Sequence, residues 1–140
     1  MTAKKRLLLV DDDLDILEQL SLALAGEGYE VATAQGRQEG EEALMLGRPD
    51  LAVIDLMMEE MDSGFVLCHE LKKLYPDTPV IILTAVTAAT GLDFHAHSDE
   101  ARAWVKADGL LDKPVRFEQL KEEVRRLLQS RAMEASALHP

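Results

Sequence analysis

Five side chains that can take part in metal or phosphate chemistry each stand at the end of a short apolar run. They are Asp11, Asp12, Asp55, Thr84 and Lys113. Three of them are carboxylates, which repel one another when they are gathered in one place. A hard divalent cation relieves that repulsion, and oxygen ligands favour Mg²⁺ or Mn²⁺. The residue types therefore predict a small metal site, provided that the fold brings these positions together.

The same side chains could also carry phosphoryl transfer. The Asp55 carboxylate can attack phosphorus and form an acyl phosphate. The Lys113 ammonium and a metal ion would neutralise the phosphoryl oxygens, and the Thr84 hydroxyl could donate a hydrogen bond to one of them. Because phosphoryl transfer depends mainly on positioning and charge neutralisation, these parts are sufficient for the reaction.

The elements that must position these side chains alternate along the chain. Short apolar runs predict strands at residues 7–10, 29–34, 51–54, 79–83 and 109–111. Helical spacing, with Gly or Pro after several of the segments, predicts helices at 14–25, 37–46, 65–74 and 117–131. Residues 85–108 fit neither pattern.

Strands that alternate with helices predict an α/β fold, a doubly wound five-stranded parallel sheet in a three-layer αβα arrangement. Right-handed crossovers favour the flavodoxin-like strand order 2-1-3-4-5. The carboxyl ends of parallel strands share one edge of the sheet, so the five side chains are expected to meet there. We expect one domain over residues 1–133 and a flexible C-terminal tail over residues 134–140.

Composition and charge exclude several classes of function. The 140 residues suffice for one domain, and 47% hydrophobic residues can form an aliphatic core. The net charge of −11 opposes binding to nucleic acid and to anionic membranes. No apolar run approaches the length of a membrane span or a signal peptide. The single cysteine, Cys68, excludes an internal disulfide, is expected in the core, and favours a cytoplasmic location.

Four short motifs, taken together, resemble the receiver domain of two-component response regulators. They are Leu7-Leu8-Leu9-Val10-Asp11-Asp12, Val53-Ile54-Asp55, Leu83-Thr84-Ala85 and Asp112-Lys113-Pro114. They occur in the family's order, and the resemblance covers residues 5–131. It implies that Asp55 accepts a phosphoryl group from a histidine kinase or a phosphotransfer protein. It also implies that the phosphorylated chain signals by binding a downstream target protein.

The resemblance further implies a ligand set for the metal. Asp12 and Asp55 would ligate Mg²⁺ (or Mn²⁺), Asp11 would help through water, and the backbone carbonyl of Met57 would be a further ligand. A cis peptide bond would precede Pro114. The chain would be a signalling domain rather than an enzyme, with slow self-phosphorylation and autodephosphorylation chemistry. No output domain follows the last predicted helix, so we expect a stand-alone receiver, a monomer or weak dimer.

The predicted output end of the domain departs from the usual receiver pattern. Leu110 stands where the family usually has Tyr or Phe, and we expect this leucine to stay buried in both states of a switch. Lys113 follows Thr84 by 29 residues, which is longer than usual. We therefore expect residues 85–106 to carry the change of shape on phosphorylation, with Trp104 holding that segment on the body.

The stretch after Asp55 departs as well. The family often reads Met-Pro-x-Met-Asp-Gly there, whereas this chain reads Met58-Glu59-Glu60-Met61-Asp62-Ser63-Gly64. The proline is missing and Ser63 is an extra residue.

Two other functions remain open on the sequence. The first is a phosphohydrolase of the haloacid dehalogenase type, because Asp11-Asp12-Asp13 after a strand resembles its first motif. Its later Gly-Asp-x-x-x-Asp motif is missing, however, and Asp55 would have no role. The second is a pseudo-receiver, a binding module without phosphate chemistry, which Leu110 and the altered stretch after Asp55 favour.

A calcium-binding loop is excluded. Asp11, Asp13 and Asp15 alternate like the start of such a loop, but Ile16 and Leu22 stand where it needs Gly and Glu. Asp13 and Asp15 are expected instead in the first turn of a helix, where acidic side chains suit the helix dipole.

Overall fold

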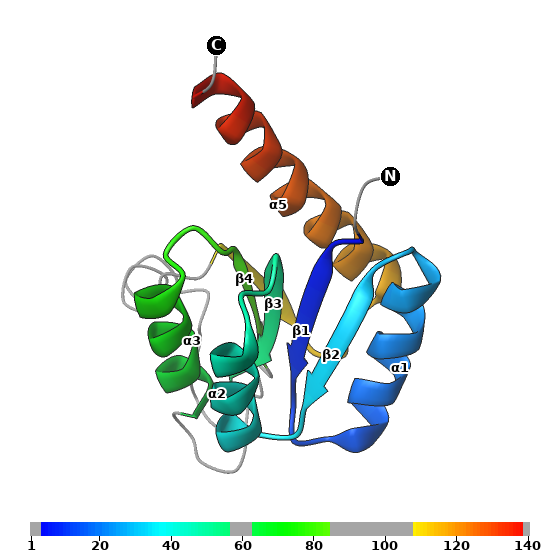
Figure 1. The fold of residues 1–140 in the computed structure, drawn as a ribbon. Coiled ribbons are helices and arrows are strands. Elements are labelled where there is room, and N and C mark those ends of the chain that lie inside the picture. Colours follow the sequence, from blue (N-terminus) through cyan, green and yellow to red (C-terminus); the bar gives the residue numbers. More distant parts are fainter. Residues whose placement is uncertain (1–3, 57–62, 85–107, 139–140) are drawn as a thin grey trace.

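The computed structural model describes residues 4–56, 63–84 and 108–138, which form alternating strands and helices (Figure 1). In chain order these are β1 (Arg6–Val10), α1 (Leu14–Gly26), β2 (Glu30–Ala34), α2 (Arg37–Leu46), β3 (Leu51–Asp55), α3 (Ser63–Leu74), β4 (Val80–Thr84), β5 (Gly109–Asp112) and α5 (Phe117–Leu138). Each strand and each helix predicted from the sequence is present.

The strands form one parallel sheet in the order β2-β1-β3-β4-β5. This confirms the predicted doubly wound fold. The order reverses at β1, because the chain moves outward from β1 to β2 and then returns to place β3 on the other side of β1. In such sheets the crevice at the carboxyl ends, near this reversal, is the usual place for a site.

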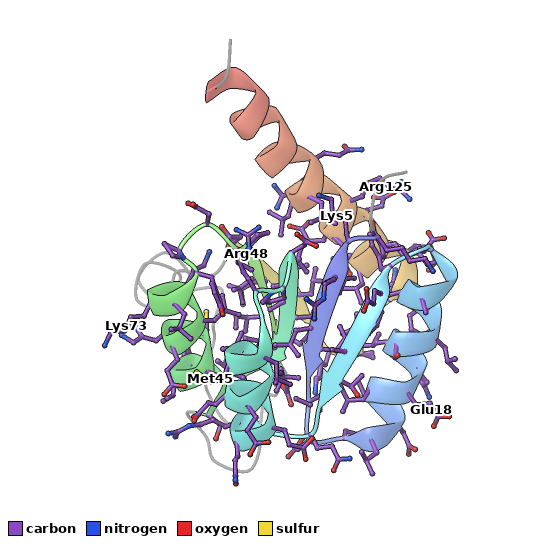
Figure 2. The ribbon with its side chains drawn as sticks, in the orientation of Figure 1. Lys5, Glu18, Met45, Arg48, Lys73 and Arg125 are labelled. Carbon is purple, nitrogen blue, oxygen red and sulfur yellow. The ribbon has the colours of Figure 1, made fainter. Side chains whose placement is uncertain are left out.

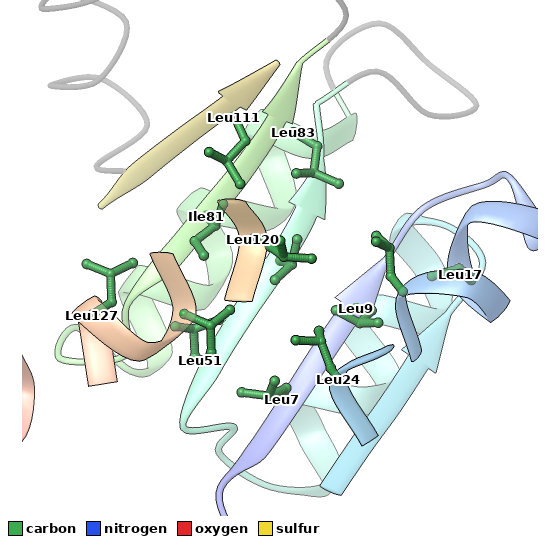
Figure 3. Packing of buried hydrophobic residues seen from close by; sticks show 13 residues of the cluster. Leu7, Leu9, Leu17, Leu24, Leu51, Ile81, Leu83, Leu111, Leu120 and Leu127 are labelled. Atoms are coloured by element: carbon green, nitrogen blue, oxygen red, sulfur yellow. The ribbon is translucent and has the colours of Figure 1, made fainter. Parts of the chain in front are cut away.

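Helices cover both faces of the sheet, and the strand residues alternate between two buried clusters. Leu7 and Leu9 of β1 pack with α1 and α5, whereas Leu8 and Val10 pack with α2 and α3. Figure 3 shows the first of these clusters, in which Leu17 and Leu24 from α1 and Leu120 and Leu127 from α5 meet the strands. Full burial of one such side chain contributes about 1.5–3 kcal/mol, so the two clusters hold the layers together.

The outer sides of the helices are polar or solvent-facing. Figure 2 shows Glu18 and Lys73 pointing outward from α1 and α3, and Met45 of α2 is exposed to solvent. Strand β2 is an edge strand, and most of its residues are exposed or half-buried. Strand β4 is fully buried and lies inside the sheet between β3 and β5. In the described part of the chain, no helix is both long enough and apolar enough to cross a membrane.

Asp13 begins α1 as its N-cap rather than in its first turn. Its side chain accepts hydrogen bonds from the backbone N–H groups of Asp15 and Ile16, at 3.0 and 3.4 Å. These N–H groups have no partner inside the helix, and an aspartate cap that satisfies them stabilises the helix by about 1 kcal/mol. Only Asp15 lies in the first turn, as expected.

Helix α5 continues to Leu138, and its C-terminal part extends beyond the sheet (Figure 1). The prediction that the last helix ends at Arg131 was therefore wrong, because residues 132–138 continue it. The physical reason is composition, since residues 132–138 are mostly strong helix formers and no Gly or Pro interrupts them before Pro140.

Lys72 and Asp108 join α3 to the beginning of β4 and β5. The Lys72 ammonium donates to the Thr78 carbonyl at 2.7 Å and to the Asp108 carboxylate at 2.8 Å. The same Asp108 oxygen accepts the N–H of Val80 at 2.8 Å, and the Asp108 N–H donates to the Val80 carbonyl at 2.8 Å. This cluster fixes the point at which the chain enters β5, and with it the register that carries Lys113.

Candidate functional site

Four of the five predicted side chains stand at the carboxyl edge of neighbouring strands. Asp11 directly follows β1, Asp55 is the last residue of β3, Thr84 is the last residue of β4, and Lys113 directly follows β5. Asp12 follows Asp11 at the same edge. The topology thus gathers residues that are up to 102 positions apart in the chain, as the sequence predicted.

The alternation of the strands explains which of these side chains meet. Asp55 continues the series Leu51 and Val53, which pack against α1 and α5. Lys113 continues the series that includes Leu111 on the same face. Thr84 instead continues Val80 and Ile82, which face α2 and α3. Aspartate and lysine therefore meet on one side of the edge, and Thr84 approaches it from the other.

Lys113 contacts two carboxylates at once. Its Nζ lies 3.1 Å from Oδ2 of Asp11 and 3.2 Å from Oδ2 of Asp55. Burial alone would lower the pKa of Lys113, but the neighbouring charges of Asp55 and Asp11, with their hydrogen bonds, outweigh burial and raise the pKa. The lysine is therefore held in its charged form beside the two acids.

The carboxylates form a compact cluster. Carboxylate oxygens of Asp11, Asp12 and Asp55 lie within 4.8 Å of one another. Asp11 and Asp55 are only 1% and 3% exposed, whereas Asp12 is exposed to solvent. Three acids and one lysine leave a formal excess of negative charge at this edge. Such a set of hard oxygen donors suits a divalent cation of the Mg²⁺ type.

Both carboxylate oxygens of Asp11 already have protein partners. Oδ1 accepts the backbone N–H of Asp13 at 2.9 Å, and Oδ2 accepts Nζ of Lys113 at 3.1 Å. The Asp11 N–H in turn donates to the Ala34 carbonyl at 3.1 Å, which ties this residue to the end of β2. Asp11 is thus held rigidly by three elements.

The backbone also ties the strand ends to one another. The Lys113 N–H donates to the Thr84 carbonyl at 2.9 Å, and the Leu56 N–H donates to the Leu83 carbonyl at 2.8 Å. The Lys113–Pro114 peptide bond is cis, as expected. Thr84 is buried, with 3% of its surface exposed. Its place at the edge is therefore fixed by the ladder between β3, β4 and β5.

Gly64 is a site residue to which the sequence reasoning gave no role. Its N–H donates to the Leu56 carbonyl at 3.1 Å, so the first turn of α3 packs directly on the end of β3. A Cβ at this position would lie 2.3 Å from the Asp55 carbonyl oxygen and 2.5 Å from Leu56. Close packing of the α3 backbone on the β3 backbone requires glycine here. The sequence alone does not reveal this contact; its only signal is a glycine near the start of a predicted helix.

Leu110 differs from its predicted environment. It lies on the same face as Thr84, paired in register with Ile82, and packs against the cluster under α2 and α3. It is half-buried rather than buried. Its neighbour Leu111 on the same strand faces the other cluster, beside α5, and is buried.

Several predicted features lie outside the described residues. These are the Met57 carbonyl, the segment 85–106 and Trp104.

Cys68 is in the core as expected, and burial raises the pKa of its thiol to about 12.

Comparison with known proteins identifies the family. The family model of the response regulator receiver domain matches residues 7–125. The transcriptional regulatory protein GlrR of Escherichia coli is 51% identical over 79 residues, which is 56% of this chain and 18% of that protein. The response regulator MprA of Mycolicibacterium vanbaalenii is 35% identical over 127 residues, covering 88% of this chain and 50% of that protein. The chain thus spans half or less of these curated relatives.

A solved structure supports the same assignment. The CheY-like receiver domain protein of Methanospirillum hungatei superposes with a TM-score of 0.82 at 29% identity, covering 94% of this chain and 99% of its own. Because the family match extends over most of the chain and this relative shares the fold almost from end to end, we conclude that the chain belongs to the response regulator receiver domain family.

Proposed function

We propose that this receiver domain accepts a phosphoryl group on Asp55 from a histidine kinase or a phosphotransfer protein. The observation that supports it most directly is the contact of Asp55 Oδ2 with Lys113 Nζ at 3.2 Å inside a cluster of acids. A nucleophilic carboxylate, a fixed ammonium and a place for a divalent cation are the parts that phosphoryl transfer to aspartate requires.

The donor set supports Mg²⁺ (or Mn²⁺) as the cofactor. Asp12 and Asp55 would hold the ion directly, together with the Met57 carbonyl. Asp11 would act through water, because its two oxygens are already engaged by Asp13 and Lys113. When bound, the ion neutralises charge on the phosphoryl oxygens and on Asp55.

The transfer itself needs few protein movements. An Asp55 oxygen forms a bond to phosphorus while the bond from phosphorus to the donor histidine nitrogen breaks. The electron pair of that bond stays on the imidazole, which leaves as a neutral ring protonated at its other nitrogen. Lys113 turns from Asp55 toward a phosphoryl oxygen, and the Thr84 hydroxyl donates to another. Slow self-phosphorylation and autodephosphorylation would follow from the same geometry.

Receiver domains act in signalling by contact with kinases and with downstream targets, and we infer the same for this chain. The output would be a phosphorylation-dependent protein–protein interaction. The cytoplasmic location, the absence of nucleic-acid binding and the monomer or weak dimer stay predictions from the sequence.

The proposal is tested by incubating the protein with Mg²⁺ and acetyl phosphate and measuring the intact mass. We expect one labile phosphoryl group in the wild type and none in Asp55→Asn, which keeps the size of the side chain. Label on Asp11 with turnover would support the hydrolase reading instead. No label on correctly folded wild-type protein would support the pseudo-receiver reading.

A further inference from the structure

Ser63, the first residue of α3, carries an unusual hydroxyl. The residue is 1% exposed, yet its Oγ has no hydrogen-bond partner, and among the described residues it is the one buried side-chain oxygen or nitrogen in this condition. Buried polar groups are nearly always hydrogen-bonded, because an unpaired one has lost its bonds to water without compensation. In the protein without a bound phosphoryl group or metal ion, which we call the unloaded protein, this unpaired hydroxyl therefore lowers the stability of the fold.

Its place in the fold connects it to Asp55. The next residue, Gly64, donates its N–H to the Leu56 carbonyl at 3.1 Å and packs so closely that a Cβ would lie 2.3 Å from the Asp55 carbonyl oxygen. Leu56 in turn donates to Leu83 at 2.8 Å. Ser63 thus stands one residue from the contact that joins α3 to the strand end carrying the proposed phosphoacceptor.

We infer that Ser63 is a positioning residue for the contact between α3 and the end of β3, and that its hydroxyl gains a hydrogen-bond partner when a phosphoryl group and Mg²⁺ occupy the site. This inference rests on the proposed function. If the hydroxyl is unpaired in the state without ligand and hydrogen-bonded in the state with ligand, the free energy of that hydrogen bond favours the state with ligand. Ser63 is also the extra residue between Asp55 and Gly64 relative to the usual receiver pattern. The inferred role is therefore particular to this chain.

The inference predicts effects of opposite sign for Ser63→Ala. Removing an unpaired buried hydroxyl should stabilise the unloaded protein, raising Tm by about 2–6 °C. Loading should become weaker, because the new bond cannot form. The affinity for beryllium fluoride with Mg²⁺, a mimic of the phosphoryl group, should fall about tenfold. A purely structural serine would lower the unloaded Tm and leave the affinity unchanged.

The experiment measures Tm with and without Mg²⁺ and beryllium fluoride for the wild type, Ser63→Ala, Ser63→Thr and Asp55→Asn. Ser21→Ala in α1, on the other face of the sheet, is the matched control. It should leave the affinity unchanged and raise Tm only slightly, through the higher helix propensity of alanine. Ser63→Thr keeps the hydroxyl and should retain most of the affinity that Ser63→Ala loses.

The outcomes separate the inference from the proposed function. If the wild type is not stabilised by the mimic more than Asp55→Asn is, the proposed function fails and this inference with it. If the wild type is stabilised and Ser63→Ala binds the mimic equally well, the inference alone fails. It also fails if Ser63→Ala lowers the unloaded Tm or does not fold, because the hydroxyl then has a partner in the unloaded protein.

Discussion

Lys113 holds two buried carboxylates in place at the centre of the site. Its contacts to Asp11 and Asp55, at 3.1 and 3.2 Å, compensate two charges that solvent scarcely reaches. Removing one partner of such a group is costly, because the remaining charges stay buried without compensation. The lysine is therefore important for the unloaded fold as well as for the proposed chemistry.

Lys113→Met is expected to destabilise the protein by about 3 kcal/mol in the absence of divalent cations. Mg²⁺ should restore part of this loss, since the ion can replace the missing positive charge. Urea unfolding with and without Mg²⁺ measures both effects. Lys121→Met is the control, because Lys121 is a partly exposed residue 3.8 Å from Glu27 and such pairs contribute little. Equal losses in the two variants would contradict the prediction.

The same lysine predicts a dependence on pH. The pKa of Lys113 is raised in the folded protein above its usual 10.5, mainly through Asp55 and Asp11 acting against burial. A raised pKa means that the charged lysine stabilises the fold fully below pH 10.5, and that this contribution is lost as pH rises through the folded pKa. The stability difference between wild type and Lys113→Met should thus be constant from about neutral pH to pH 10.5, where the carboxylates are ionised, and shrink above that value.

Gly64→Ala is expected to destabilise the fold by about 2–3 kcal/mol, because the new methyl group would overlap the Asp55 carbonyl and the Leu56 backbone. Urea unfolding measures the loss. Gly26→Ala at the end of α1 is the matched control, since a Cβ there meets nothing within 4 Å, and it should be neutral or slightly stabilising. A Gly64→Ala protein as stable as wild type would show that α3 can move away from β3 at little cost.

At the scale of elements, the cluster of Lys72 and Asp108 controls where β5 begins. Lys72→Met should cost about 1.5–3 kcal/mol, since it removes charge-assisted hydrogen bonds to Asp108 and Thr78. Hydrogen exchange should also become faster at the amides of Val80 and Asp108. Lys73→Met is the control, because Lys73 points outward from α3 (Figure 2) and should behave like wild type.

The elements show which features of the protein are readable from its sequence. Apolar runs ending in Asp55 or Thr84 located the strands, because burial on both faces leaves a continuous apolar pattern. The right-handed crossover rule predicted their order. The half-burial of Leu110 depends on what packs on its face of β5, and the contact of Gly64 with Asp55 depends on how α3 approaches β3. Both are set by tertiary packing. The end of α5 was missed because helix-favouring residues past Arg131 carry no apolar periodicity.

At the scale of the whole molecule, the excess of acidic residues bears on the proposed binding of a cation. With a net charge of −11, repulsion between like charges already destabilises the compact fold, and the three clustered acids add to this repulsion. Mg²⁺ at 100 times its Kd should stabilise the protein by about 2.7 kcal/mol, since the open chain lacks the site. Thermal unfolding at constant ionic strength measures the gain.

Asp12→Ala should reduce this gain without harming the unloaded fold, because Asp12 is exposed. Excess chelator should likewise prevent phosphorylation by acetyl phosphate. A gain that is equal in Asp12→Ala and wild type would place the bound cation elsewhere on the acidic surface.

The contact between Asp11 and Lys113 joins residues separated by 102 positions. Asp11 leaves the ribosome early in synthesis, but its partner emerges only after β1, β3 and β4 have all been made. A nascent chain that ends before β5 lacks Lys113, and with it the contacts to Asp11 and Asp55. The proposed phosphorylation site is therefore complete only when β5 docks on β4, and we expect a kinase to leave an unfinished chain unmodified.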